Sequence, residues 1–338
     1  MNRNLRADGS AAPAPGSNPS RADKIFPNAS RLGLGCASLG SRVEASKGLR
    51  GLERAFDHGV NWFDLAPSYG DGEAEGIFGT FASSRRDRIH ICTKVGLAPS
   101  AVGPLARALK PLAQRLVTIA PRLRSLVRRA RPAPRRLALE GQLITSSLDA
   151  SLRRLRTDYV DVLALHYPDL DILAREDVWG SASTCNGKRQ STAVGVAGGP
   201  VVAGAAIEQS LPIDHIQFAP GAFGDSLAEM APVTRLARSV AVYSVFAGVV
   251  EMQSVKASTL RSLLIRHGYS ADVGSSLRAA LLDHALASTP NGVIVVSLFE
   301  SAHQDFALER LGSCDGSKAS ALLRSLRNLI AFTKELER

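Results

Sequence analysis

The sequence Val60–Glu75, VNWFDLAPSYGDGEAE, begins like a buried β-strand and then places charged and turn-forming residues where the strand should end. Asp64 occupies a position at which the run should stay apolar, and Tyr69 follows between a Pro-Ser turn and a Gly-Asp-Gly turn. Taken alone, an aspartate at the end of a strand is more typical of a turn or a helix cap than of a reactive group. Residues elsewhere in the chain decide between these two interpretations.

Apolar runs rich in β-branched residues recur along the chain and alternate with helical patterns. The expected strands are 31–38, 60–66, 88–96, 159–166, 192–198, 215–220, 240–246 and 292–297. The expected helices are 45–58, 73–83, 141–155, 200–210, 225–238, 256–267 and 275–289, with a weaker helical pattern at 174–190. Strands that alternate with helices indicate parallel βαβ units. Eight such strands favour a closed (β/α)8 barrel, the TIM barrel, over a doubly wound sheet.

A Rossmann fold is the alternative for this pattern. The stretch GLGCASLG, residues 33–40, offers glycines, but their spacing does not match the dinucleotide-binding fingerprint. In addition, no acidic residue closes a matching second strand. The α/β barrel is therefore the fold class that we predict.

One Arg-rich insertion interrupts the alternation after the third strand. Residues 98–140 exceed the usual connection between a strand and its helix, and they have a helical period that prolines interrupt. Within it, residues 101–140 contain ten basic residues and one acidic residue, so most of the net charge of +10 belongs to the insertion. It contains no aromatic residue that could stack on bases, so nucleic acid is not an expected partner. We expect a solvated helical lid or an interaction surface near the rim of the barrel.

The remaining composition suggests how the chain is divided. We predict a disordered leader at residues 1–29, rich in Ala, Pro, Ser and Gly, and a single barrel domain at residues 30–338 that includes the inserted segment. Small polar residues dominate 180–191, so the helix there should be short or poorly packed.

Cysteine usage and hydropathy suggest a cellular compartment. The four cysteines form no C-x-x-C pair and no metal-ligand spacing, which indicates a reduced, cytoplasmic protein without a metal site. No apolar run reaches the length of a membrane span, so we expect no membrane partner. The oligomeric state is not readable from the sequence.

Ionisable residues stand at the ends of three successive predicted strands. Asp64 ends the second strand, with Tyr69 just beyond it. Lys94 ends the third strand and His166 ends the fourth. Reactive groups of a (β/α)8 barrel lie at the carboxyl ends of its strands, so these side chains should share one rim.

Together these residue types suit proton transfer. A tyrosine with an ordinary pKa near ~10 is a poor proton donor at neutral pH, and a nearby ammonium should lower that pKa. Lys94 can supply this charge, and Asp64 can keep Lys94 protonated. His166 can donate a hydrogen bond to a substrate oxygen or share a proton with Tyr69. The set is suited to protonating a carbonyl oxygen while another group delivers a hydride to the carbon.

Three stretches resemble the aldo-keto reductase family. They are GVNWFDLAPSYGDGEAE (59–75), ICTKVG (91–96) and SSLDASLRRLRTDYVDVLALHYPD (146–169), within a similarity that runs from about Arg31 to about Leu311. The resemblance implies that Tyr69 is the general acid/base, that Asp64 and Lys94 tune it, and that His166 orients the carbonyl. It also implies an NAD(P)-dependent oxidoreductase, an aldo-keto reductase or alcohol dehydrogenase. Such an enzyme transfers a hydride between the cofactor and a small aldehyde, ketone, aldose or alcohol.

The same resemblance implies a cofactor site without a Rossmann fold. NADP(H) is the cofactor of most members, and NAD(H) is the alternative. Gln217 matches the residue that binds the nicotinamide carboxamide, and Tyr243 the aromatic that stacks on the nicotinamide ring. The resemblance also assigns Ser244, Phe246 and Ser297 to this cofactor site.

The sequence departs from the family at the cofactor end. Residues 197–199 supply no side-chain donor where members usually offer a Ser-Asn-like pair. Val296, Leu298 and Phe299 stand where many members place polar or basic phosphate ligands, so a 2′-phosphate would lack its basic partner. A non-catalytic or regulatory member is therefore the alternative function, since the family resembles the potassium-channel β subunits, which act mainly through partners.

Overall fold

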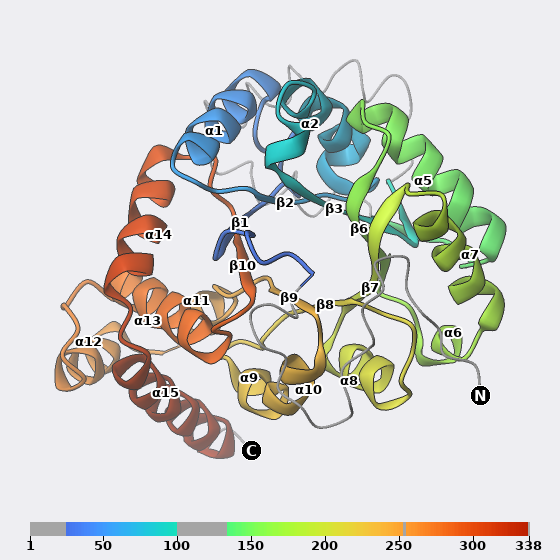
Figure 1. The fold of residues 1–338 in the computed structure, drawn as a ribbon. Helices are drawn as coiled ribbons and strands as arrows, with labels where there is room; N and C mark the ends of the chain where they lie inside the picture. The colour runs from blue at the N-terminus through green and yellow to red at the C-terminus, as the bar shows by residue number, and fades with distance from the viewer. Residues whose placement is uncertain (1–24, 100–133, 253–254, 337–338) are drawn as a thin grey trace.

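The computed structural model describes residues 25–99, 134–252 and 255–336, and their centre is a closed barrel of parallel strands (Figure 1). The strands, in order around the barrel, are β1 (Leu32–Gly35), β2 (Trp62–Asp64), β3 (His90–Val95), β6 (Val160–His166), β7 (Ser191–Gly198), β8 (His215–Phe218), β9 (Ser239–Val242) and β10 (Val293–Val296). β1 closes the barrel because Leu34 pairs with Phe63 of β2 on one side and with Val296 of β10 on the other. The predicted (β/α)8 barrel is confirmed.

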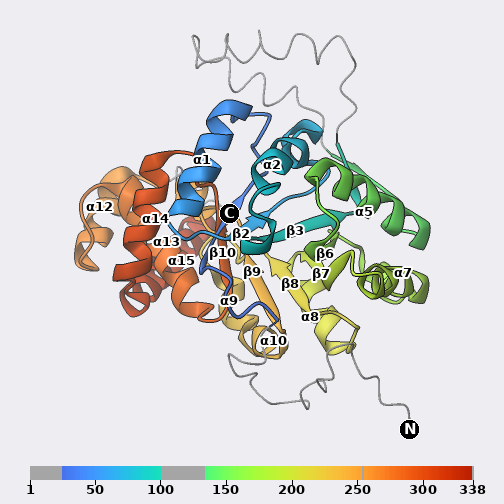
Figure 2. The same cartoon turned by 45° about the horizontal axis from the view of Figure 1, so that its top comes forward.

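Helices surround the barrel in a ring, as Figures 1 and 2 show. The larger ones are α1 (Ala45–Asp57), α2 (Ala74–Ala82), α5 (Gly141–Leu155), α7 (Glu176–Gly187), α8 (Pro200–Glu208), α12 (Ala257–Arg266), α13 (Val273–Ser288), α14 (Ser301–Ser313) and α15 (Gly316–Leu336). Shorter segments are η2 (Tyr69–Gly72), η3 (Arg86–Arg88), α6 (Leu170–Leu173), α9 (Asp225–Glu229), α10 (Ala231–Leu236) and α11 (Gly248–Glu251). Within the described ranges, no helix combines the length and apolar composition that crossing a membrane requires.

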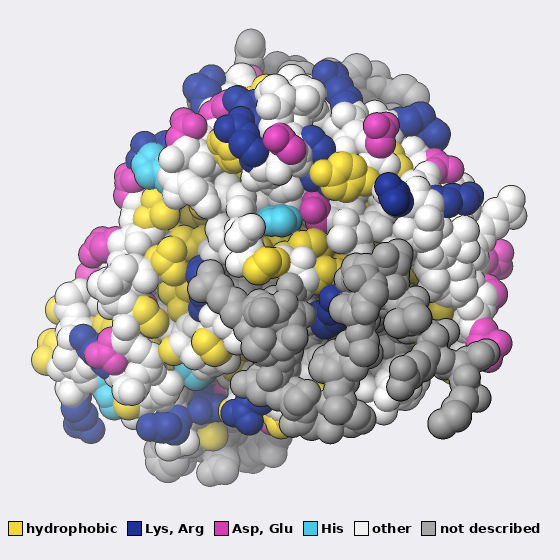
Figure 3. Space-filling view, viewed as in Figure 1, with side chains coloured by type: hydrophobic (Ala, Val, Ile, Leu, Met, Phe, Trp, Pro, Cys, Tyr) yellow, Lys and Arg dark blue, Asp and Glu magenta, His cyan; other side chains and the backbone are white. Residues whose placement is uncertain are grey.

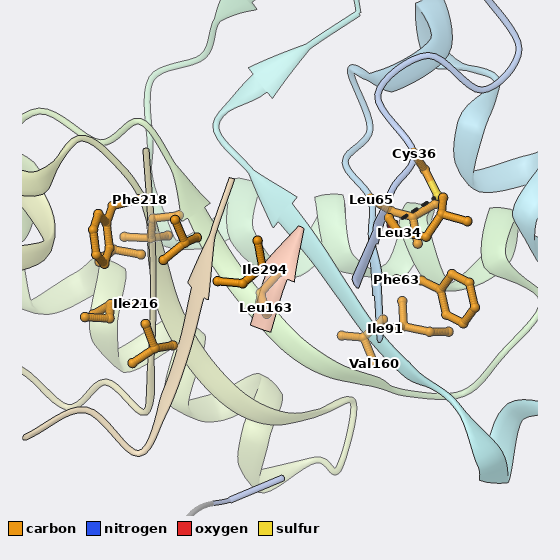
Figure 4. Close-up of a cluster of buried hydrophobic side chains, with 14 of the residues drawn as sticks. Leu34, Cys36, Phe63, Leu65, Ile91, Val160, Leu163, Ile216, Phe218 and Ile294 are labelled. Carbon is orange, nitrogen blue, oxygen red and sulfur yellow. Dashed lines mark hydrogen bonds between the residues drawn. The ribbon is translucent and has the colours of Figure 1, made fainter. Parts of the chain in front are cut away.

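The alternation of side chains along each strand separates two cores. Residues that point outward pack against the helices, and Figure 4 shows several of them, including Phe63, Leu163 and Ile294. Residues that point inward fill the barrel, among them Trp62, which is fully buried. Because Asp64 follows Trp62 by two positions, it points into the same interior.

The end of the barrel at which the strands begin is covered by the segment that precedes β1. There Phe26 packs edge-on against Trp62, with ring centroids 5.6 Å apart. Residues 25–29, which the sequence assigned to the leader, therefore include one that packs against the barrel interior. The rest of the predicted leader lies outside the described residues.

The base of the insertion is a short antiparallel ribbon. β4 (Leu97–Ala98) pairs with β5 (Arg135–Arg136) directly beyond β3. Residues 100–133 lie outside the described part of the chain, so the helical structure predicted for them is not described. The ribbon places both ends of the insertion at the carboxyl end of the barrel, next to Lys94.

Three parts of the helix prediction differ from the structure. α7 is a full helix of 12 residues that buries Trp179, Ala182 and Cys185, because its small side chains allow close packing on α5. The predicted helix 225–238 is two short helices, α9 and α10. The sequence pattern missed α14 and α15, of which α15 packs against α13 to form a separate core that includes Leu322 and Leu326.

The charged residues of the described surface are mixed in sign. In Figure 3, basic and acidic side chains are interspersed around the rim of the face shown, and hydrophobic side chains gather nearer its middle. Among the described residues on this face, the basic side chains do not form an extended surface of the kind that follows a nucleic-acid backbone.

The packing of α2 against α5 can be tested with two glycines of the same helix. A Cβ at Gly79 would fall against the carbonyl oxygen of Arg154 and 2.9 Å from the carbonyl carbon of Leu155. Gly79→Ala should therefore lower the free energy of unfolding by about 1–3 kcal/mol. A Cβ at Gly76 meets no atom within 4 Å, so Gly76→Ala should leave stability unchanged or raise it by about 0.5–1 kcal/mol. Urea unfolding of both variants checks this, and equal midpoints would contradict the packing described.

Candidate active site

A cavity of about 390 Å³ opens at the carboxyl end of the barrel. Its lining consists of Ala37, Ser41, Ser68, Tyr69, Gly70, Asp71, Lys94, Leu97, Pro134, His166, Tyr167, Ala197, Gln217, Tyr243 and Ser244. A smaller cavity of about 170 Å³ lies at the opposite end, beside Phe26 and Trp62. The larger cavity is the candidate site, because the ionisable side chains at the strand ends converge there.

The centre of the site is a buried ion pair. Lys94 Nζ donates to Asp64 Oδ1 at 2.5 Å and to the carbonyl oxygen of Leu65 at 2.8 Å. Both charged residues are nearly inaccessible, with 2% exposure for Lys94 and 3% for Asp64. Burial alone would lower the pKa of Lys94, but Asp64, followed by Tyr69 and Cys92, raises it above the ordinary value. Lys94 is therefore charged at neutral pH.

Gln217 joins this pair from the far side of the barrel. Its Nε2 donates to Asp64 Oδ1 at 2.9 Å, and its Oε1 accepts from the thiol of Cys92 at 3.7 Å. The sequence assigned Gln217 to the cofactor carboxamide. In the structure its amide is engaged with Asp64, so this carboxylate accepts hydrogen bonds from side chains of two other strands.

Tyr69 begins η2, just beyond β2, and its hydroxyl reaches the same carboxylate. The hydroxyl donates to Asp64 Oδ2 at 3.3 Å, and Lys94 Nζ lies 4.8 Å from the centroid of the Tyr69 ring. Burial and the charge of Asp64 raise the pKa of Tyr69, and Lys94 offsets only part of that increase. The predicted lowering of this pKa is therefore wrong for this arrangement, because burial of the hydroxyl and the nearby carboxylate together outweigh the effect of the ammonium.

His166 lies at the end of β6 with its ring edge-on to Tyr69, their centroids 5.9 Å apart. Burial, followed by the charge of Lys94, lowers the pKa of His166 to about 3, so the imidazole is neutral at neutral pH. Its Nδ1 is buried and has no hydrogen-bond partner in the part of the chain that the structure describes. A proton on Nδ1 would be a buried donor without an acceptor among the described residues, so we assign the tautomer with the proton on Nε2.

The remaining residues assigned to the cofactor divide into two groups. Tyr243 and Ser244 line the cavity, and the Tyr243 hydroxyl donates to the carbonyl oxygen of Gly198 at 3.2 Å. Phe246 packs between the two hydrophobic cores, and Ser297 is exposed beyond β10; neither lines the cavity. The structure thus brings seven of the predicted residues together: Asp64, Tyr69, Lys94, His166, Gln217, Tyr243 and Ser244.

Sequence reasoning missed Tyr167, which follows His166 and lines the same cavity. Its hydroxyl lies 2.6 Å from that of Tyr243. The sequence did contain a signal for Tyr167, because this residue directly follows the predicted strand 159–166. Leu97 and Pro134 were also missed, since they line the cavity only because β4 and β5 pair.

The arrangement defines a barrel protein in which Tyr69 and Lys94 share one buried carboxylate, and part of its sequence matches a known family. Residues 31–186 match the model of the Aldo/keto reductase family. The predicted family resemblance is confirmed: the chain carries an aldo/keto reductase sequence in this segment, which includes Asp64, Tyr69, Lys94 and His166.

Individual relatives agree with this assignment. The chain is 29% identical over 144 residues to a probable voltage-gated potassium channel subunit beta of Arabidopsis thaliana, covering 42% of this chain and 34% of that protein. It is 28% identical over 147 residues to the aldo-keto reductase YhdN of Bacillus subtilis, covering 42% and 35%. The matches thus span about a third of the length of these curated relatives.

A solved structure extends the likeness of fold beyond the matched segment. The aldo-keto reductase AKR11C1 from Bacillus halodurans, in its holo form, superposes with a TM-score of 0.64 at 18% identity. The superposition covers 88% of this chain and 92% of that one. The two proteins therefore share the barrel fold over most of the length of each chain.

The buried pair can be tested through stability. Asp64→Asn should lower the free energy of unfolding by about 3–5 kcal/mol, because it leaves Lys94 charged and buried without its partner. The double variant Asp64→Asn with Lys94→Met should recover most of that loss. Asp169→Asn is the matched control, since its partner Arg136 and Asp169 itself are 61% and 68% exposed, and it should cost at most about 1 kcal/mol. A double variant as unstable as Asp64→Asn would show that the pair does not have this role.

His166 gives a prediction for pH. Its pKa of about 3 in the folded protein lies below the ordinary 6.5, so between these values the unfolded chain binds one proton more. Stability should therefore be fully present above about pH 6.5 and fall as pH drops toward 3, with about 1.4 kcal/mol per pH unit due to His166. Unfolding of the wild type and of His166→Asn at several pH values measures the difference in slope. Parallel pH profiles would refute the buried, neutral imidazole.

Proposed function

We propose that the chain is a nicotinamide-dependent oxidoreductase that interconverts a small carbonyl compound and its alcohol. The observation that carries this proposal is the convergence of the Tyr69 hydroxyl, the charged Lys94 and the neutral His166 on one cavity. A reducible carbonyl needs a proton for its oxygen, and these residues can supply and stabilise it.

The residues of the cavity fit the nicotinamide end of such a cofactor. Tyr243 offers a half-buried aromatic ring, and its neighbours in the lining, Ala197 and Gln217, carry no charge. A flat ring that carries an uncharged carboxamide suits these partly aromatic, uncharged walls. When bound there, the nicotinamide would donate or accept the hydride.

The fit at the phosphate end is less complete. Leu298 and Phe299 are buried, and Ser297 is the exposed polar residue of this segment. The nearby ammonium of Lys47 forms an ion pair with Glu300. The family favours NADP(H), whereas these side chains suit a cofactor without a 2′-phosphate, so NAD(H) is the alternative.

In the reductive direction Tyr69 is the proposed proton donor. Its raised pKa keeps the hydroxyl protonated at neutral pH. The hydroxyl would leave Asp64 for the carbonyl oxygen, which costs little because the 3.3 Å bond that it breaks is long. As the hydride reaches the carbon, the oxygen becomes an alkoxide, a stronger base than a phenolate, and takes the proton from Tyr69.

The neighbouring residues support this transfer. Lys94 would stabilise the phenolate that remains on Tyr69, and Asp64 would keep Lys94 charged. Nε2–H of His166 would donate to the carbonyl oxygen and hold it beside Tyr69. The products are an alcohol and the oxidised cofactor, and the phenolate regains its proton from solvent.

The test combines binding with turnover. The dissociation constants of NADPH and NADH are measured by fluorescence, and the tighter cofactor is used with a panel of aldehydes, ketones and aldoses. Tyr69→Phe should lower turnover by about 10²–10⁴ while dinucleotide binding survives. Tyr159→Phe is the matched control, because Tyr159 packs on Arg86 outside the cavity. Wild-type protein that binds neither dinucleotide and reduces no carbonyl would disprove the proposal.

A regulatory binding protein is the second candidate. Two observations favour it: one relative is named a probable potassium channel subunit beta, and Tyr69 has a raised rather than a lowered pKa. Under this alternative the wild type would bind a dinucleotide but turn over no carbonyl compound. Tyr69→Phe would then change neither dinucleotide binding nor carbonyl turnover, which would already be absent in the wild type.

A further inference from the structure

Tyr167 has an unusual backbone at the rim of the cavity. Its φ of 52° lies in the left-handed region, which is strained for a bulky side chain. Its amide donates to the carbonyl oxygen of Ala197 at 2.7 Å, so this backbone is held by the end of β7. The side chain stays 39% exposed although it lines the cavity. A conformation that costs free energy and buries little suggests a role other than packing.

The side chain makes two contacts within the candidate site. Its ring stacks on His166 with centroids 5.4 Å apart and an angle of 23° between the planes. Its hydroxyl lies 2.6 Å from the hydroxyl of Tyr243. The face of the Tyr167 ring therefore contacts His166, and its hydroxyl contacts Tyr243.

Tyr167 supplies a restraint to each of the two residues that it contacts. Nδ1 of His166 has no hydrogen-bond partner among the residues described, so its ring is held by packing between Tyr69 and Tyr167. The Tyr243 hydroxyl has the Gly198 carbonyl as its other partner, at a longer 3.2 Å. The shorter bond to Tyr167 is thus the main restraint on the end of that ring.

We propose that Tyr167 is a positioning residue that fixes the His166 imidazole through its ring face and the Tyr243 ring through its hydroxyl. This inference rests on the proposed function, which assigns the His166 imidazole to the carbonyl oxygen and the Tyr243 ring to the nicotinamide. A fixed imidazole aims its N–H at the carbonyl oxygen, and a fixed tyrosine ring is a preorganised surface for the nicotinamide. The strain at Tyr167 is the cost of turning one side chain toward both groups.

Two variants separate the two contacts. Tyr167→Phe keeps the ring that stacks on His166 but removes the hydroxyl that bonds Tyr243. Tyr167→Ala removes both. Tyr159→Phe again serves as the control, and because Tyr167 is partly exposed, both variants are expected to fold.

The first measurement needs no cofactor. NMR of histidine-labelled protein, with His166→Asn used to assign the signal, follows protonation of His166 as pH is lowered. Removing the ring exposes the imidazole to water, so Tyr167→Ala should raise its pKa by about one pH unit or more, while Tyr167→Phe should match the wild type. An unchanged His166 titration in Tyr167→Ala would overturn the proposed role toward this residue.

The second measurement is a double-mutant cycle on dinucleotide binding. Tyr167→Phe should weaken binding of the preferred dinucleotide about fivefold, the effect of one lost hydrogen bond. In a Tyr243→Phe background, which has no hydroxyl to hold, the same change should weaken binding by less than about twofold. An equal loss in both backgrounds would overturn the proposed link to Tyr243. If the wild type binds neither NADH nor NADPH, the proposed function fails, and the His166 titration still decides the positioning role.

Discussion

The ion pair of Asp64 and Lys94 is the constraint on which the structure at the carboxyl end of the barrel depends. Two charges with almost no exposure are stable only when each has the other and their remaining hydrogen bonds are satisfied. Asp64 meets this requirement by accepting from Lys94, Gln217 and Tyr69. Because these donors come from different parts of the barrel, one carboxylate fixes the relative positions of β2, β3, β8 and the η2 turn.

This arrangement also determines the charge states of its neighbours. The charge of Lys94 helps to keep His166 neutral, whereas the charge of Asp64 helps to keep Tyr69 protonated. A neutral imidazole and a protonated phenol are both hydrogen-bond donors, so the cavity presents donors to an oxygen that enters it. These donors suit the carbonyl oxygen of the proposed reaction.

The sequence was sufficient for the barrel and for the polar groups at its strand ends, because both follow from periodicity along a strand. It was insufficient for α7, where small side chains weaken the amphipathic pattern yet allow closer packing, and for α14 and α15, which follow the last strand. The direction of the Tyr69 pKa could not be predicted either. It depends on the distance of the hydroxyl from a carboxylate and an ammonium, and residue order does not contain that distance. Tyr167 was missed because its importance lies in contacts across the rim, with Tyr243 on the far side of β7 and β8.

The ribbon of β4 and β5 has a consequence for how this chain can vary. Ala98 and Arg135 are paired neighbours outside the barrel, so the two ends of the connection between them are held together next to β3. Loop-closure entropy grows slowly with length, by about 0.6 kcal/mol for each doubling, so a longer or shorter connection would change the stability of the barrel little. We therefore expect the connection between β4 and β5, which begins and ends beside the cavity, to accept insertions, deletions and substitutions with little effect on the stability of the barrel.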